Sequence, residues 1–480
     1  MKIANCPSCG AQVAFTSAAS VMAVCPYCRA TVLRDGATAE NVGRLSEILD
    51  DFSPVQLGTQ GKWQGKSFTV MGRLRLKYED GAWNEWSIDF DDGSQGWLSD
   101  ASGQYVVTRH RPSATTPPPY EQIRVGMRTK VAGRTYTVTD ARTCVCVGGE
   151  GELPAQAFDG RAFPSVDLRS GKSFITFDYS DVPPSVYAGE ASSREELEFS
   201  NLRTGEAIEA ATGKLRGGVA GFDCPSCGAS LEYHPGFGES IACSYCKALV
   251  ALEGSRKTVI LKQREIDARG PTLPLGARGT LRGKSYQVIG FMSRADEEGG
   301  EWEEYLLFDR DGGFQWLTYG DNEWYFGEVL NTLPEELSDG VYHDSKMFRL
   351  ESEYSASTRY VLGEFNWRVK VGDSAQVTEW IHEGYLLSRE LYQNEVTWTY
   401  STRISSTALA KAFGLPLAPD DNERPTALPS IRNLPWDWVF AAWVVAFVVD
   451  IIAHLAGHGS FGAFLVAAVL LYVPKDLWDN

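Results

Sequence analysis

Two identical sets of four cysteines constrain this chain more than any other feature of its sequence. Each set consists of two C-x-x-C pairs with fifteen residues between them. The second set repeats the first at a shift of 218 residues, and the eight cysteines are Cys6, Cys9, Cys25, Cys28, Cys224, Cys227, Cys243 and Cys246. Because each C-x-x-C turn aims two thiolates at one point, two turns supply the tetrahedral sulfur ligands that zinc prefers. The spacing predicts two zinc ribbons, residues 1–36 and 219–254, and two zinc ions per chain.

We expect these sites to be structural, since four thiolates leave no open position for an activated water. Paired disulfides are the alternative, and they need an oxidising compartment. The first ten residues, MKIANCPSCG, lack the apolar stretch of a secretory signal, so we expect reduced cysteines and a cytoplasmic N-terminal bulk. The remaining cysteines, Cys144 and Cys146, lie two apart on an expected strand. We interpret them as buried core residues rather than as a third metal site.

The duplication extends well beyond the cysteines. The string GKSF at residues 65–68 returns as GKSY at residues 283–286, again at a shift of 218. A weaker repeat lies within the first module, where Gly126 and Gly133 have the spacing of Gly58 and Gly65. Each unit is a glycine turn followed by alternating polar and apolar residues, which is typical of strands. The pattern predicts a mainly β protein in which each module is a small antiparallel barrel or sandwich.

Composition sets the expected domain boundaries. Proline-rich residues 112–120 split the first β module into two halves, and several prolines and charges mark a linker before the C-terminal tail. Helical periodicity is confined to short stretches near residues 40–50, 193–202 and 405–413. The expected units after the first ribbon are β module 1 at 52–205, the second ribbon, β module 2 at 270–414, the linker at 415–435 and an apolar tail at 436–474.

The apolar tail predicts a transmembrane helical hairpin. Residues 438–456 would span about 28 Å as a helix, and residues 457–473 could make a second, shorter crossing. One crossing with a buried or re-entrant segment, and a helix pair buried in a soluble protein, are the alternatives. Asp450 lies within the first span, where a charge is costly, so it is a candidate for a functional contact in the membrane or for an interfacial position.

The charge of the chain argues against nucleic-acid binding, and the absence of known catalytic motifs argues against an enzyme. The net charge of −17, without a Lys/Arg cluster, disfavours a nucleic-acid partner. The Gly-Lys-Ser triplets at 65–67, 171–173 and 283–285 lack the earlier glycine of a phosphate-binding loop and are interpreted as turns. No H-E-x-x-H or G-x-S-x-G motif occurs. Glu364, on the distinctive segment that ends at Trp367, remains as a possible functional acid, with a sheet-edge role as the alternative.

Two stretches, roughly residues 52–200 and 270–413, resemble a bacterial family known as domain of unknown function 4178. In the second module the resemblance rests on five motifs: Gly283-Lys284-Ser285-Tyr286, Trp302 with Tyr305, Gln315-Trp316-Leu317, Gly363-Glu364-Phe365-Asn366-Trp367 and Glu395-Val396-Thr397-Trp398. The first module departs from this pattern, since Leu153-Pro154 stands where the G-E-aromatic segment is expected. The resemblance implies a zinc-ribbon or membrane-linked β protein and supplies no activity.

Together these features predict a non-enzymatic, membrane-anchored cytoplasmic adaptor or regulator. Its β modules would bind a protein partner in or at the bacterial inner membrane, with the lipid bilayer as a second contact and no nucleic acid. An enzyme or enzyme subunit with a site near Glu364 is the first alternative. Nucleic-acid binding through the ribbons is the second.

Overall fold

The computed structural model divides the chain into two units, and the described residues all lie in the first, Met1–Ala418. The second unit, Pro419–Asn480, lies outside them, and with it the predicted hairpin at 436–474, most of the linker and Asp450. Among the described residues no helix is long and apolar enough to cross a membrane. The structure describes residues 2–15, 22–28, 30–35, 38–44, 53–111, 116–153, 160–205, 207–208, 220–233, 240–243, 245–246, 248–253, 256–262, 271–309 and 313–416.

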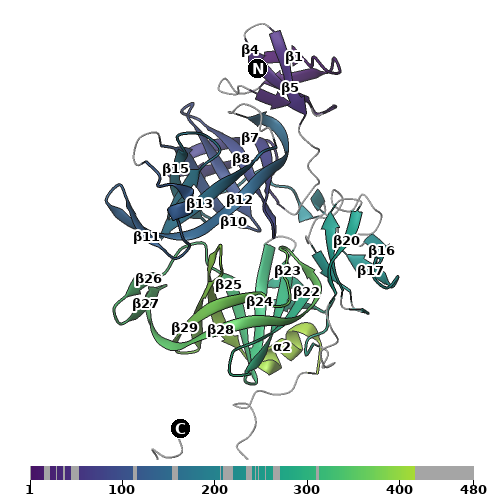
Figure 1. Cartoon of the computed structure of the whole chain (residues 1–480), viewed down its shortest axis with the longest axis vertical. Helices are drawn as coiled ribbons and strands as arrows, with labels where there is room; N and C mark the ends of the chain where they lie inside the picture. The colour runs from purple at the N-terminus through teal and green to yellow at the C-terminus, as the bar shows by residue number, and fades with distance from the viewer. Residues whose placement is uncertain are drawn as a thin grey trace, which may run out of the picture. The chain divides into compact units, whose positions relative to one another are not determined.

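The first β module closes into a ring of eight antiparallel strands (Figure 1). Two four-stranded meanders form it, and they join where β10 pairs with β15 and where β7 pairs with β12. The short strands β6 and β11 make hairpins with β7 and β12. The elements are β6 (Gln60–Trp63), β7 (Lys66–Lys77), β8 (Ala82–Phe90), β9 (Gln95–Ala101), β10 (Gln104–His110), η1 (Tyr120–Gln122), β11 (Arg128–Val131), β12 (Arg134–Leu153), β13 (Ala162–Ser170), β14 (Ser173–Asp178) and β15 (Ser185–Ser192).

The second module repeats this ring strand for strand. Its meanders join at the pairings of β25 with β31 and of β22 with β28. Strand β27 pairs with β28 as β11 pairs with β12, and one further strand, β26, pairs with β27. The elements are β21 (Arg278–Leu281), β22 (Lys284–Ala295), β23 (Glu301–Asp309), β24 (Gly313–Gly320), β25 (Glu323–Val329), β26 (Glu335–Leu337), β27 (Gly340–His343), β28 (Lys346–Phe365), β29 (Ser374–His382), β30 (Tyr385–Leu391), β31 (Val396–Ile404) and α2 (Ser406–Phe413). The predicted mainly β fold is confirmed, and the predicted halves of a module are the two meanders of one barrel.

Each ribbon is joined to the longest strand of its own module. Strand β3 pairs with the end of β12, and β18 pairs with the end of β28. The ribbon strands are β1 (Lys2–Asn5), β2 (Gln12–Phe15), β3 (Met22–Val24), β4 (Ala30–Asp35) and β5 (Thr38–Arg44), and β16 (Ala220–Asp223), β17 (Ser230–Tyr233), β18 (Ser240–Ala242), β19 (Ala248–Glu253) and β20 (Arg256–Lys262). A metal bound in a ribbon would therefore brace the edge of a barrel.

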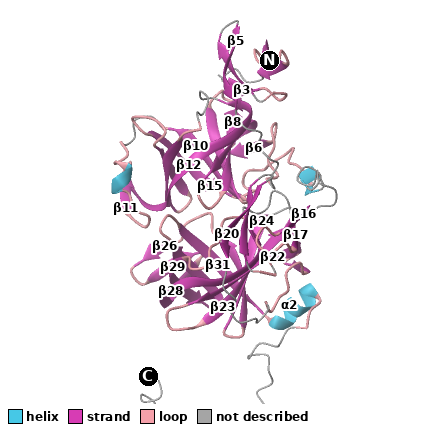
Figure 2. Cartoon of the chain, turned by 45° about the vertical axis from the view of Figure 1, so that its right-hand side comes forward, coloured by secondary structure: helices cyan, strands magenta, loops and turns pink. Residues whose placement is uncertain are grey.

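One of the three predicted helical stretches is an α-helix, α2, among mostly extended chain (Figure 2). The Ser405 hydroxyl caps it by accepting a hydrogen bond from the Ala408 N–H, and Leu409 and Phe413 pack into the core of the second barrel. The other two predictions are wrong where the chain is described. Residues 38–44 form β5, and residues 194–198 form successive turns. The first segment pairs with β4 along its length, and this tertiary pairing overrides its helical pattern.

Candidate metal centres and polar barrel interiors

The structure brings the eight predicted cysteine ligands together in two clusters that could hold a metal ion such as zinc. In the first, Sγ of Cys6 lies 3.6 Å from Sγ of Cys28, and Sγ of Cys9 lies 3.7 Å from Sγ of Cys25. The same two pairs in the second cluster are 3.7 and 3.8 Å apart. A tetrahedron with Zn–S bonds of about 2.3 Å has sulfur–sulfur edges of about 3.8 Å. The sulfur positions therefore fit zinc.

Hydrogen bonds shift the pKa values of the cysteines of a cluster in opposite directions, since those from the other thiols raise the pKa of Cys9 to about 12. The Ala30 N–H lowers the pKa of Cys28 to about 6 by hydrogen bonding. In the knuckle before it, the Gly10 N–H donates to the carbonyl of Cys6 across 2.7 Å, with Gly10 at a φ of 78°. Gly228 and Cys224 make the same contact in the second ribbon at 2.8 Å. Glycine suits this turn because a left-handed backbone is strained for other residues.

Cys144 and Cys146 lie apart from both clusters. Their side chains are 1% and 6% exposed and pack with Leu74, Leu76 and Phe163. Burial raises the pKa of both thiols, that of Cys146 to about 11. They are buried core residues, as predicted.

Glu364 lies at the junction between ribbon and barrel. It is 5% exposed, and its backbone pairs with Ile241 of β18. Next to it, Gly363 has a φ of 80°, and a Cβ there would lie 2.2 Å from the carbonyl oxygen of Ile289. Trp367 is partly buried in the adjoining core, with its ring 5.4 Å from that of Trp316.

The first module keeps the glycine and the glutamate of this segment, while Leu153 and Pro154 stand in place of Phe365 and Asn366, as the sequence indicated. Gly151 pairs with Gly72, as Gly363 pairs with Gly290, and Glu152 follows it with 6% exposure. The matching segment is Gly151-Glu152-Leu153, at a shift of 212 residues. The shift is smaller here than at the cysteines because Gly151 lies 54 residues after Trp97, whereas Gly363 lies 47 residues after the matching Trp316.

The barrel interiors carry charge, which sequence reasoning did not anticipate. In the second barrel, Arg294 of β22 is 2% exposed, and its Nη1 lies 3.1 Å from Glu304 of β23 and 2.8 Å from Glu390 of β30. Strands β22 and β30 are not neighbours, because β28 and β29 separate them in the ring. The three side chains therefore meet inside the barrel. Burial raises the pKa of Glu304, whereas contact with Arg294 outweighs burial and lowers the pKa of Glu390.

The first barrel has carboxylates at the same places. The indole N–H of Trp83 donates to Glu85 at 2.7 Å, and that of Trp302 donates to Glu304 at the same distance. Thr176 and Ser388 donate to a second acid in each barrel, Asp167 and Glu379. Asp178 and Glu390 complete the sets, each lying two residues after these hydroxyl donors on β14 and β30. Three interior acids are thus common to the two barrels.

Burial raises the pKa of Glu85 to about 7, and the negative charges of Asp167 and Asp178 add to this effect. Glu85 lies on β8 and Asp178 on β14, which are opposite strands of the ring. Because the charge of Asp178 acts on Glu85 across the ring, both side chains face the interior.

Arg142, another charged residue of the first barrel, pairs with Asp140 and with Glu395 of the second module. Alternation in a strand shows that it has two different faces but not which one lines the ring. Here one apolar cluster packs against flanking residues such as Val55 and Leu197, and a second, with Leu76 and Cys144, lies on the face of the interior acids.

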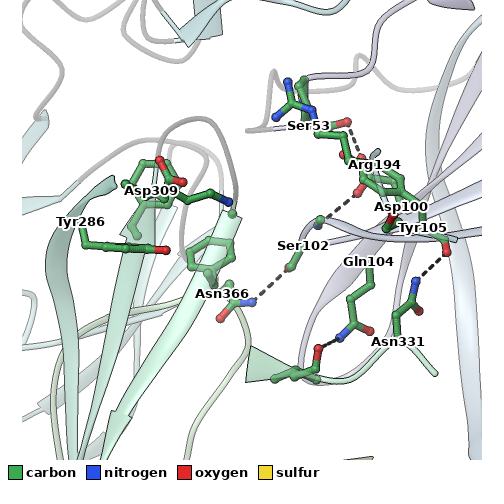
Figure 3. Close-up of a pocket in the computed structure, with 18 of the residues that line it drawn as sticks. Ser53, Asp100, Ser102, Gln104, Tyr105, Arg194, Tyr286, Asp309, Asn331 and Asn366 are labelled. Carbon is green, nitrogen blue, oxygen red and sulfur yellow. Dashed lines mark hydrogen bonds between the residues drawn. The ribbon is translucent and has the colours of Figure 1, made fainter. Parts of the chain in front are cut away.

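A pocket of about 1010 Å³ is lined by both modules (Figure 3). Hydrogen bonds cross between the modules there: Asn366 Nδ2 donates to Ser102 Oγ at 3.0 Å, and Asn331 Nδ2 donates to the carbonyl of Tyr105 at 2.8 Å. These polar groups join the barrels. None of the cysteines or interior acids lines this pocket.

Two closed eight-stranded barrels, each preceded by a four-cysteine ribbon, define a duplicated ribbon-and-barrel protein. The chain matches the family described as domain of unknown function (DUF4178) twice, at residues 56–194 and 274–406, which together exceed half its length. The chain belongs to this family. Searches of curated proteins and of solved structures found no match.

Proposed function

We propose that this chain is a non-enzymatic, membrane-anchored adaptor or regulator of the bacterial inner membrane, with its N-terminal bulk in the cytoplasm. Each four-cysteine cluster holds one structural zinc ion, so that the chain carries two. Zinc binding to such a site contributes on the order of 10–16 kcal/mol to folding at neutral pH. That free energy suffices to order a ribbon and to brace the barrel edge with which it pairs.

The observation that carries the partner-binding role is a repeated exposed tyrosine. Tyr27 and Tyr245 lie between the last two cysteines of their ribbons and are 76% and 72% exposed. A tyrosine offers a large apolar surface and a hydroxyl at low conformational cost, and tyrosines are enriched at protein interfaces. Held on a metal-braced turn, each ring is already in place for a protein partner.

The enzymatic alternative with Glu364 as an acid has less support. Glu364 is 5% exposed and its backbone pairs with Ile241 of β18, so its carboxyl has little contact with solvent from which a substrate would come. Nucleic-acid binding has less support, since the net charge is −17 and the sequence holds no cluster of Lys and Arg.

The test is affinity capture from solubilised membranes with the intact chain and a Tyr27→Ser, Tyr245→Ser double variant. We expect the variant to lose the captured partner while keeping both zinc ions, because neither tyrosine is a ligand. A Tyr342→Ser variant is the matched control, since Tyr342 is also exposed, at 42%, but lies on β27. Equal capture by all three proteins would reject the tyrosine contact.

Removal of residues 436–480 tests the anchor separately. The intact chain should sediment with membranes, and the shortened chain should not, because the apolar tail supplies the insertion free energy. An intact chain that stays in the soluble fraction would rule out the anchor.

A further inference from the structure

The two barrels share interior carboxylates but differ in the group that neutralises them. In the second barrel, the Arg294 guanidinium lies between Glu304 and Glu390, with its Cζ 5.7 Å from the centre of the Trp302 ring. Arg294 faces Trp302 in the pairing of β22 with β23. At the same place in the first barrel, Leu76 faces Trp83. The first barrel therefore keeps the acids and the tryptophan but replaces the cation with an apolar side chain.

The other interior cations of the first barrel serve different acids. Arg142 pairs with Asp140 and Glu395, and Arg169 acts on Asp167. Leu76 ends well short of the position that a guanidinium reaches from the same strand. Glu85 and Asp178 are partly buried, and the donors to Glu85 are the neutral groups of Trp83 and Ser99.

We propose that the first barrel binds an external organic cation, a guanidinium or primary ammonium group of a small ligand, between Glu85 and Asp178. The ligand takes the place that the Arg294 guanidinium fills in the second barrel. That guanidinium is the observation that points to a ligand, because the equivalent acids already bind one. Trp83 would flank the cation as Trp302 flanks Arg294. This site is independent of the tyrosine contact proposed above.

The test titrates methylguanidinium chloride into the intact protein, with sodium chloride at equal ionic strength as the blank, and follows binding by calorimetry. We expect one site of millimolar affinity, as suits so small a ligand. A Leu76→Arg variant carries its own cation and should lose binding by at least about tenfold. The matched Leu76→Met variant, neutral and of similar volume, should keep it.

Glu85→Gln and Arg294→Leu extend the test. Glu85→Gln removes one acid and should weaken binding, whereas Arg294→Leu recreates the uncompensated acids in the second barrel and should add a second site. Absence of a methylguanidinium-specific signal in the wild-type protein would overturn the proposal. So would binding by the Leu76→Arg variant equal to that of the wild type.

Discussion

At the scale of single residues, the interior acids show how one position changes the state of a whole barrel. The same carboxylate is paired with Arg294 in the second barrel and faces other acids in the first, where Leu76 replaces the arginine. A buried acid without a cation costs stability when it ionises. Residues that reduce stability in this way are often retained for function.

Glu85 should therefore make the protein less stable as the pH rises. Its pKa is about 7 in the folded protein and near 4.5 when unfolded, so folding favours the protonated acid. This contribution is fully present below pH 4.5 and is lost as the pH rises through about 7. In the ligand-free protein, Glu85→Gln should match the wild type near pH 4.5 and exceed its stability at pH 8 by about 2–3 kcal/mol in urea unfolding.

Glu304→Gln is the contrasting variant. It removes a partner of the buried Arg294, so it should lower stability at pH 8 instead of raising it. If the stability gained by Glu85→Gln did not change with pH, the raised pKa of Glu85 in the folded protein would be contradicted.

At the scale of elements, the sequence predicted the ribbons and many of the strands. It did not predict which strands pair to close the barrel or which face of a strand lines its interior. The cysteine spacing and the glycine turns of the repeat identified the ribbons and the hairpins β6–β7 and β21–β22. Ring closure joins strands far apart in sequence, such as β7 with β12, and no local pattern encodes that pairing. Periodicity likewise could not assign Glu85 to the interior, because an alternating strand looks the same when its polar face is inside.

The close pairing of β22 with β28 requires a glycine at position 363. Gly363 and Gly384 have φ values of 80° and 82°, but only at Gly363 would a Cβ meet backbone, the Ile289 carbonyl oxygen. Gly384→Ala should cost roughly 1 kcal/mol from the left-handed backbone alone. Gly363→Ala should cost at least about 3 kcal/mol, since the strands must also separate. Equal losses in denaturant unfolding would show that the close approach of the strands is not needed.

At the scale of the whole molecule, the chain is one unit duplicated and then differentiated. Both copies keep the closed set of four cysteines, the ribbon pairing and the three interior acids. The second barrel has Arg294 between two of these acids, whereas the first has Leu76 at that position. On the proposal above, the second copy is a support that needs no ligand and the first binds one. Both barrels pair with a ribbon whose four cysteines could hold a metal ion, and the proposed partner contacts lie on those ribbons.

Zinc content of the intact purified chain tests this account most directly. Measured by atomic emission without added chelator, the wild-type protein should contain two zinc ions per chain. Cys227→Ser should contain one, because three thiolates leave the second cluster incomplete. Cys144→Ala should keep two, since this buried cysteine belongs to neither cluster. A wild-type content of zero or one would contradict the assignment of both ribbons as structural zinc sites.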